Sequence, residues 1–342
     1  MTRALRSPSG AFSVRVRPRA LLVGVLLLLA VLVLGVLALT TGDFPASPAD
    51  VVRVLFGDGP RGLELVVTRF RLPRLLVAVA VGAALGAAGS IFQSVSKNPL
   101  GSPDVIGFTT GSATGALVVL LVAKDSVIGV SGGAVLGGVV SALVVYALAY
   151  RRGVQGFRLI LVGIGVSAVL AAVNAYLLSR ASLKEAQSAQ LWLVGSLNGR
   201  GWDHAVPVWV ALAVLLPVVV ALGRRMTLLE MGDETATARG VPVERTRVVL
   251  VMAGVALTAA ATAAAGPIAF VALAAPQVAK RLVRGGGAGP LAAALTGAVL
   301  LVGADLAGQR LLPVPLPVGL STGAVGGLYL VWLLGREWRG ER

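Results

Sequence analysis

The 342-residue sequence is 56% hydrophobic and only 13% charged, with a mean hydropathy of +0.88. A soluble domain cannot bury that much apolar surface, and runs near the roughly 20 residues that span a bilayer recur along the chain. The absence of cysteine excludes disulfides and thiolate metal sites. The net charge of +15 could indicate nucleic-acid binding, but the arginines mostly lie between apolar runs, where they set membrane orientation. We therefore predict an all-α, polytopic membrane protein with no nucleic-acid partner.

Ten apolar runs predict ten transmembrane helices. Backbone groups in lipid must be satisfied within the segment, and the alternating strands of roughly ten residues that a β-barrel needs are not visible. The first run is longer than the apolar core of a cleavable signal peptide, so we expect it to be retained. The predicted spans are residues 20–39, 72–95, 103–122, 127–150, 157–178, 205–222, 248–265, 267–282, 290–309 and 316–334.

The charge pattern predicts that both termini are cytoplasmic. Arginine-rich connections alternate with connections of low charge, as the positive-inside rule requires of ten spans. The chain then divides into a basic cytoplasmic amino terminus at 1–19, a ten-helix domain at 20–335 that includes the long cytoplasmic loop 224–247, and a cytoplasmic tail at 336–342. One external segment breaks the rule, because five arginines gather before the second span: Arg53, Arg61, Arg69, Arg71 and Arg74.

Small residues and helix breakers predict local packing. The segment KNPLGSPDVIG (97–107) interrupts two apolar runs, with Ser102 expected as N-cap, Pro103 as the first residue and Asp104 in the first turn of the third span. Glycines spaced four apart let helix backbones approach closely in lipid. Three such series are present: Gly82/Gly86, Gly107/Gly111/Gly115 and Gly319/Gly323/Gly327.

The chemistry-bearing residues argue against an enzyme or an ion-driven carrier. There is no Gly-x-x-x-x-Gly-Lys-Ser/Thr phosphate loop, so the chain is not its own ATPase of that type. Asp104 and Asp305 fall near the ends of predicted spans, whereas proton- or sodium-driven carriers place ionisable groups at membrane depth. The segment GVSGG matches a short serine-hydrolase signature around Ser131, but the histidine base that it needs could only be His204, in a polar loop.

The loop 224–247 is long for a connection between spans. It contains a helix-like run at 228–239, followed by Gly240 and Pro242, which suit a helix end and restart. Acidic residues among its arginines favour a docking surface, with a solvated loop as the alternative. A permease whose ATPase is a separate chain needs such a loop.

Several long segments resemble the FecCD/BtuC-type permeases of ABC importers, which include iron-siderophore and vitamin B12 permeases. The first is RFRLPRLLVAVAVGAALGAAGSIFQSVSKNPLGSPDVIGFTTG (69–111). Others are LLEMGDETATARGVPVERTR, AGPIAFVALAAPQVAKRL and GADLAGQRLLPVPLPVGLSTGAVGGLYLVWLL, so the resemblance extends over about 20–335. The stretches NPLGSPDVIGF, GSLNG, RRMTLLEMGD and GGLYL resemble the ferric enterobactin branch in particular.

The resemblance implies a type II ABC importer permease fold in a bacterial cell membrane. It implies import of a catecholate ferric siderophore by alternating access, with no metal or cofactor held by this chain. ATP and Mg would be used by a cytoplasmic ATPase dimer. The other implied partners are a second, related permease, in a heterodimer or a homodimer, and an extracytoplasmic siderophore-binding protein. The alternatives are a haem or vitamin B12 permease and, from another class, a proton-coupled secondary transporter.

The resemblance also implies roles for individual residues. Arg71 and Arg74 match an external Arg-x-Pro-Arg that contacts acidic residues of the binding protein. Departures from the family pattern are Gln277 where a histidine is frequent, Gln309 where vitamin B12 permeases have arginine, and Pro315 where a glutamate is frequent. The residues that match the ATPase-coupling motif are Leu228, Leu229, Glu230, Met231, Gly232, Asp233 and Gly240. Candidates for the cargo pathway are Gln93, Asn174 and Ser196.

Overall fold

The structure is a computed structural model and is almost entirely helical. It describes residues 3–6, 13–16, 18–42, 44–123, 126, 128–150, 156–284, 289–311 and 314–340. Its elements are β1 (Arg3–Arg6), β2 (Ser13–Val16), α1 (Pro18–Thr40), α2 (Pro48–Leu55), α3 (Arg61–Leu65), the π-helix η1 (Val66–Arg71), α4 (Leu72–Ser96), α5 (Phe108–Leu121), α6 (Gly129–Ala149), α7 (Gly156–Arg180), α8 (Leu183–Leu193), α9 (Trp202–Glu230), α10 (Asp233–Ala238), α11 (Val243–Ala265), α12 (Val271–Val283), α13 (Gly289–Arg310) and α14 (Val318–Gly340).

Ten of these helices follow the ten predicted spans in order: α1, α4, α5, α6, α7, α9, α11, α12, α13 and α14. Within the described residues, seven helices are long and apolar enough to cross a membrane. Two of the others, α5 and α12, have only 14 and 13 residues, which is short of the roughly 20 that a full span needs. The prediction of ten helices is therefore confirmed, but α5 and α12 are shorter than the predicted spans 103–122 and 267–282.

Backbone breaks explain why α5 and α12 are short. Ser102 does accept a hydrogen bond from the backbone N–H of Val105, at 3.3 Å, but only a short turn follows it. Gly107, with φ 89°, then ends that turn, and α5 begins at Phe108. The prediction that Ser102 caps the third span was thus wrong by one turn. In α12 the break is Phe270, which has a left-handed backbone with φ 68°.

Several short elements add to the ten predicted helices, and two of them are strands. The basic amino terminus contains the short antiparallel pair β1 and β2, in which Arg3 lies opposite Val16. Between α1 and α4 lie α2, α3 and η1, and α8 follows α7. None of these short elements was predicted, because each is far shorter than an apolar run of bilayer length.

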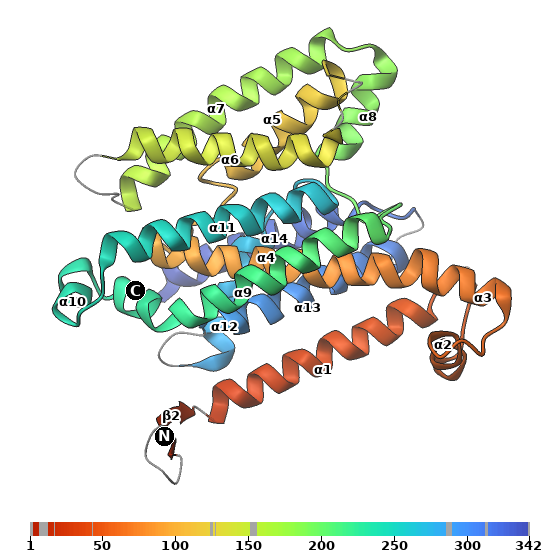
Figure 1. Cartoon of the computed structure of the whole chain (residues 1–342), viewed down its shortest axis with the longest axis horizontal. Coiled ribbons are helices and arrows are strands. Elements are labelled where there is room, and N and C mark those ends of the chain that lie inside the picture. The colour runs from red at the N-terminus through yellow and green to blue at the C-terminus, as the bar shows by residue number, and fades with distance from the viewer. Residues whose placement is uncertain are drawn as a thin grey trace.

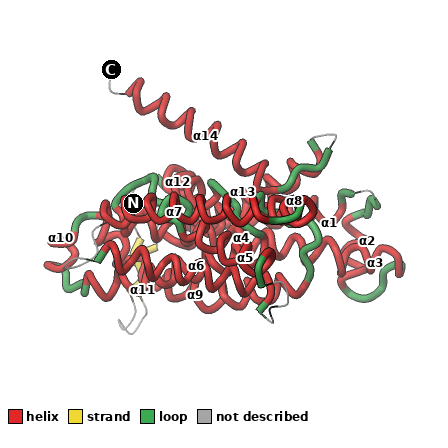
Figure 2. Tube along the Cα trace, turned by 90° about the horizontal axis from the view of Figure 1, so that it is seen from above, coloured by secondary structure: helices red, strands yellow, loops and turns green. Residues whose placement is uncertain are grey.

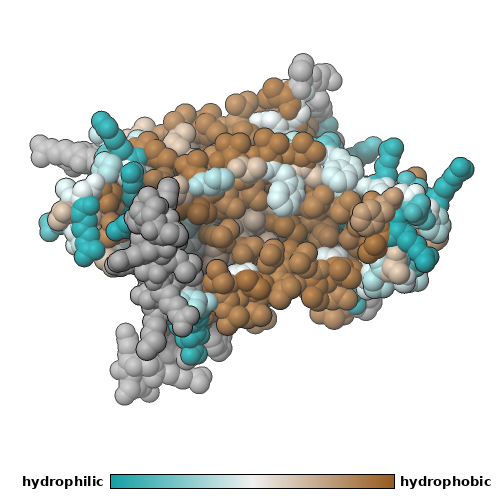
Figure 3. Space-filling view, turned by 60° about the horizontal axis from the view of Figure 1, so that its bottom comes forward, coloured by the Kyte–Doolittle hydropathy of each residue, from teal (hydrophilic) through white to brown (hydrophobic). Residues whose placement is uncertain are grey.

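Helix α4 lies at the centre of the bundle (Figure 1). It is packed among α9, α11, α12 and α13, while α5, α6 and α7 form a second layer on one side and α1 lies on the other. Of its apolar stretch 83% is buried, compared with 17% for α1 and 11% for α7. Apolar side chains form a band across the face shown in Figure 3, with hydrophilic residues at both ends. We call these ends the α2 end and the α10 end, after the helices that mark them in Figure 1.

Two of the three glycine series make the close helix contacts that were predicted. A Cβ on Gly82 of α4 would lie 2.5 Å from the carbonyl oxygen of Gly297 on α13. Likewise, a Cβ on Gly115 of α5 would lie 2.8 Å from Cα of Gly137 on α6. The absence of a side chain is what allows these backbones to touch.

The third glycine series is predicted correctly only at its first residue. Gly319 packs against the backbone of Val194, but a Cβ on Gly323 or Gly327 would meet no atom within 4 Å. The reason is the course of α14, which leaves the bundle at an angle (Figure 2).

The long loop is more helical than predicted. Helix α9 continues to Glu230, the backbone turns at Gly232 with φ 117°, and α10 begins at Asp233. The helix-like run predicted at 228–239 is therefore two helices with a break between them. Gly240, with φ 77°, ends the second one as expected.

Candidate functional site

At the α10 end, Lys97 connects the end of α4 to the start of α10. Lys97 caps α4 in a left-handed conformation, φ 53°, which is uncommon for a residue with a side chain. Its backbone N–H still bonds to the carbonyl of Gln93, so its position is fixed by the helix. From there Nζ donates to Oδ1 of Asp233, at 2.9 Å.

Asp233 is held from a second side by α11. Nη2 of Arg247 lies 3.0 Å from both carboxylate oxygens of Asp233, and Nη1 donates to Glu244 at 3.3 Å. The Arg247 side chain is only 6% exposed. Partial burial by itself raises the pKa of Asp233, but the hydrogen bonds from Lys97 and Arg247 outweigh it, so the net pKa lies below the ordinary value. The first residue of α10 is thus an ionised carboxylate fixed between α4 and α11.

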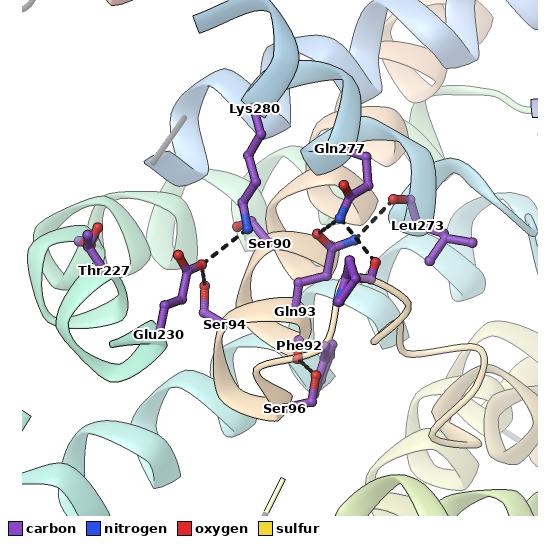
Figure 4. A network of polar contacts seen from close by, with 12 residues as sticks. Ser90, Phe92, Gln93, Ser94, Ser96, Thr227, Glu230, Leu273, Gln277 and Lys280 are labelled. Atoms are coloured by element: carbon purple, nitrogen blue, oxygen red, sulfur yellow. Dashed lines mark hydrogen bonds and ion pairs between the residues drawn. The ribbon is translucent and has the colours of Figure 1, made fainter. Parts of the chain in front are cut away.

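A second polar group joins α9 to α4 and α12 (Figure 4). Oε1 of Glu230, the last residue of α9, accepts from Oγ of Ser94 at 2.7 Å and from Nζ of Lys280 at 3.3 Å. Ser94 lies three residues before Lys97, in the last turn of α4. The last turn of α4 is therefore bonded to residues on both sides of the α9–α10 break.

The structure separates the residues of the predicted coupling motif by exposure. Leu229 is buried, with 1% of its surface exposed, and it belongs to the core rather than to a docking surface. Leu228 is partly buried, whereas Met231 is 61% exposed and Gly240 is exposed. The face available to another protein is thus Met231 and the outer side of α10.

The three predicted pathway residues do not lie together. Gln93 is 2% exposed and joins α4 to α12: its Oε1 accepts from Nε2 of Gln277 at 2.8 Å, and its Nε2 donates to the carbonyl of Leu273 at 3.1 Å (Figure 4). Ser196 lies beyond α8, where its N–H bonds to the carbonyl of Ala265 at the far end of α11. Asn174 is on α7, which belongs to the other layer. The assignment of Gln93, Asn174 and Ser196 to a cargo pathway stays a prediction.

At the α2 end, Arg74 joins three parts of the chain. Its Nε and Nη2 donate to Oδ2 and Oδ1 of Asp305 on α13, at 3.0 and 2.7 Å, and its Nη1 donates to Asn198 at 2.7 Å. Nε2 of Gln309 adds a 2.8 Å bond to the same carboxylate. The side chains of Arg74 and Asp305 are 23% and 9% exposed. Sequence reasoning had noted both residues but not their pairing, because they are 231 positions apart.

Arg71 also makes intramolecular bonds. Its Nη1 and Nη2 donate to the carbonyls of Leu39 and Phe44, at 2.7 and 2.6 Å, and so tie the start of α4 to the end of α1. The predicted contact of Arg71 and Arg74 with a binding protein stays a prediction. A cavity of about 410 Å³ lies beside them, and its charged lining residues are Arg69, Arg71, Arg74, Arg200, Arg310 and Asp305.

Ser131 and His204 line a single cavity of about 310 Å³ between α6, α9 and α11. Their hydrogen bonds do not suit a nucleophile and its base. Ser131 Oγ donates to the carbonyl of Ala263 at 3.0 Å, and His204 Nε2 lies 3.0 Å from Nη1 of Arg200. Because arginine can only donate, this histidine nitrogen is occupied as an acceptor. The geometry therefore gives no support to a serine hydrolase.

Comparisons with known proteins agree with the fold and the motifs. The FecCD transport family matches residues 27–336. The ferric enterobactin transport system permease protein FepG of Escherichia coli (strain K12) is 48% identical over 94% of this chain and 98% of that protein. The achromobactin transport system permease protein CbrC of Dickeya dadantii (strain 3937) is 40% identical over 90% of each chain. An inward-facing structure of a metal-chelate type ABC transporter superposes with a TM-score of 0.82 at 24% identity, over 92% of this chain and 99% of that one.

Proposed function

This chain belongs to the FecCD transport family, and on that premise we propose that it is the transmembrane permease subunit of an ATP-driven importer of a ferric siderophore. The single observation that carries the cargo assignment is the 48% identity to a ferric enterobactin permease over 94% of the chain. We therefore assign a catecholate siderophore of the enterobactin type. The motif stretches that resemble that branch lie at both ends of the bundle and on α14.

The α10 end is proposed to face the cytoplasm, together with both termini. This orientation follows from the basic segments 224–247 and 280–284, which the positive-inside rule places inside. A dimeric ATPase, which uses ATP and Mg, docks on Met231 and the exposed side of α10. A binding protein delivers cargo at the α2 end, where Arg53, Arg61 and Arg69 are exposed.

The transport step needs no chemistry on the cargo. The siderophore already supplies the ligands of its iron, so this chain has only to provide a path that opens to one side at a time. We propose that the path lies between this chain and a second, related permease. Helix α7, which buries only 11% of its apolar stretch within this subunit, is exposed enough to take part in such an assembly.

Uptake by the purified complex in liposomes tests the proposal. The permease pair and the ATPase are reconstituted, and the binding protein is added outside with iron-59 enterobactin. We expect uptake that requires ATP inside, the ATPase and the binding protein. Ferric hydroxamate siderophores, haem and vitamin B12 serve as matched cargos; preferential uptake of any of these would overturn the cargo assignment. Uptake driven by a proton gradient without ATP would overturn the proposal as a whole.

A further inference from the structure

One helix connects the two polar clusters. The helical segment Arg61–Ser96 is continuous through α3, η1 and α4. Arg74 lies near its α2 end, and Lys97 caps it at the α10 end. At 1.5 Å per residue, these two residues are separated by about 35 Å along the axis. Any axial or tilting movement of α4 therefore reaches both ends of the bundle.

We propose that the Lys97–Asp233 ion pair, supported by the Ser94–Glu230 hydrogen bond, is the joint through which the ATPase-docking turn moves α4, and that α4 carries this movement to Arg74 and Asp305. The inference rests on the proposed function, because it requires an ATPase that displaces α10. It assigns Lys97 and Asp233 as positioning residues for transport. It also gives the KNPLGSPDVIG segment a mechanical role, since its first residue makes the joint.

Asp233 is well placed to pass on a displacement of α10. It is the first residue of that helix, directly after the break at Gly232, so movement of the docking surface moves its carboxylate. Lys97 at the end of α4 and Arg247 on α11 both donate hydrogen bonds to this carboxylate. The backbone bond from Lys97 to Gln93 makes the lysine part of the helix end rather than of a loose loop.

The packing of α4 makes it able to transmit force. Its backbone touches α13 at Gly82 and α12 at Gly89, where a Cβ would collide with the carbonyls of Gly297 and Ala272. Close-packed interiors transmit strain rather than absorb it, because there are few voids into which a side chain can relax. The apolar stretch of α4 is 83% buried and its backbone touches two neighbours, so α4 is suited to move as a rigid element.

Lys280 provides a matched control within the same site. Like Lys97 it pairs with an acidic residue at the α9–α10 break, Glu230, and its side chain is 38% exposed compared with 39% for Lys97. It lies, however, on α12, which has 13 residues and begins only after the break at Phe270. Lys280 itself is therefore on a helix too short to reach the α2 end, whereas Lys97 ends a helix that does reach it.

The first experiment compares uptake with ATP hydrolysis in the reconstituted complex. For Lys97→Gln we expect uptake to fall about tenfold while ATP hydrolysis stays within about twofold, so that less cargo moves per ATP. Lys97→Arg keeps the charge and should restore most of the uptake. Lys280→Gln should lose less uptake than Lys97→Gln, and Lys184→Gln, on the exposed face of α8, should behave as wild type. If Lys97→Gln lowered uptake and ATP hydrolysis equally, the proposal that the Lys97–Asp233 pair transmits movement to α4 would be wrong.

The second experiment detects the movement itself. The chain has no cysteine, so Arg69→Cys introduces a single labelling site beside the cavity at the α2 end. In the complex, trapping the ATPase with ATP and vanadate should change the rate of maleimide labelling at this position several-fold, and Lys97→Gln should abolish the change. An unchanged response in Lys97→Gln, or an equal loss in Lys280→Gln, would overturn the proposal. If the wild type shows the response but transports no siderophore, the cargo assignment fails and the joint is supported.

Discussion

At the α2 end of α4 the Arg74 and Asp305 side chains are 23% and 9% exposed, whereas at the α10 end Lys97 and Asp233 are 39% and 47% exposed. The first pair is bidentate and shielded, and it also holds Asn198 and Gln309. The second is a single lysine contact near solvent, and its carboxylate is also bonded to the buried Arg247. The two ends of α4 thus carry ion pairs of similar chemistry, one shielded from solvent and one exposed to it.

The difference suggests which contacts change during a transport cycle. Removing one partner of a buried pair leaves an uncompensated charge and is strongly destabilising, while an exposed pair contributes only about 0–1 kcal/mol. The exposed pair can therefore adjust its geometry as α10 moves, at little cost in stability. The shielded pair is suited to keep its geometry while α4 moves.

The largest expected effect is the loss of the shielded pair. Asp305→Ala leaves Arg74 partly buried without its carboxylate, and we expect it to lower the free energy of unfolding by about 3 kcal/mol. The value lies at the low end for buried pairs because Arg74 keeps 23% of its side chain exposed and its bond to Asn198. Thermal unfolding of the purified protein in detergent measures the change.

The control for Asp305→Ala lies on the same helix. Arg310→Ala removes an exposed charge five residues later and should change stability by no more than about 0.5 kcal/mol. If Asp305→Ala proved as mild as Arg310→Ala, the two ends of α4 would not differ in the way described. If the pair were replaced by apolar residues, as in Arg74→Met with Asp305→Leu, much of the stability should return.

The next largest effect lies between the two ends, where α4 touches its neighbours. Gly89→Ala adds a Cβ that collides with the carbonyl of Ala272, and we expect it to cost about 1–3 kcal/mol. Gly24→Ala on α1 is the matched control, because its Cβ meets nothing within 4 Å. If unfolding measurements showed the same stability for the Gly89→Ala and Gly24→Ala proteins, α4 would not be packed tightly against α12.

Much of the fold could be predicted because bilayer-length apolar runs are a strong signal. The ten predicted helices appear in the predicted order, but the breaks at Gly107 and Phe270 were not foreseen. Phe270 has no sequence signature for its left-handed backbone. Helices α2 and α8 did carry a readable signal, since each begins with a capping box, Ser47 with Asp50 and Ser182 with Glu185.

Less of the site could be predicted, because its pairs join distant parts of the chain. Lys97 and Asp233 are 136 positions apart, and only the folded bundle brings the end of α4 to the start of α10. Resemblance marked Glu230 and Asp233 as residues that meet an ATPase. It could not show that their carboxylates are already bonded to α4, α11 and α12.

The exposed pairs should have a smaller effect on stability than on transport. Lys97→Gln and Lys280→Gln should each change the free energy of unfolding by less than about 1 kcal/mol, because their side chains are more than a third exposed. Raising the salt concentration should reduce even this difference, since charges near solvent are screened. Unfolding midpoints at low and high salt measure this change in stability. If either lysine substitution lowered the free energy of unfolding as much as Asp305→Ala does, the pairs at the two ends of α4 would not differ in their contribution to stability.

The smallest expected effect is the pH dependence of Asp233. Partial burial by itself raises its pKa, but the bonds from Lys97 and Arg247 bring the net pKa below the ordinary value. The folded-state pKa is therefore lower than the unfolded one, about 3.9, so the stabilisation is present above about pH 5 and is lost as the pH falls through the folded-state value. The difference in unfolding temperature between wild type and Asp233→Asn should be constant from about pH 7 to pH 5 and shrink towards about pH 3. A difference that grew on acidification would require a raised pKa, and the carboxylate could not then be the ionised partner that the joint needs.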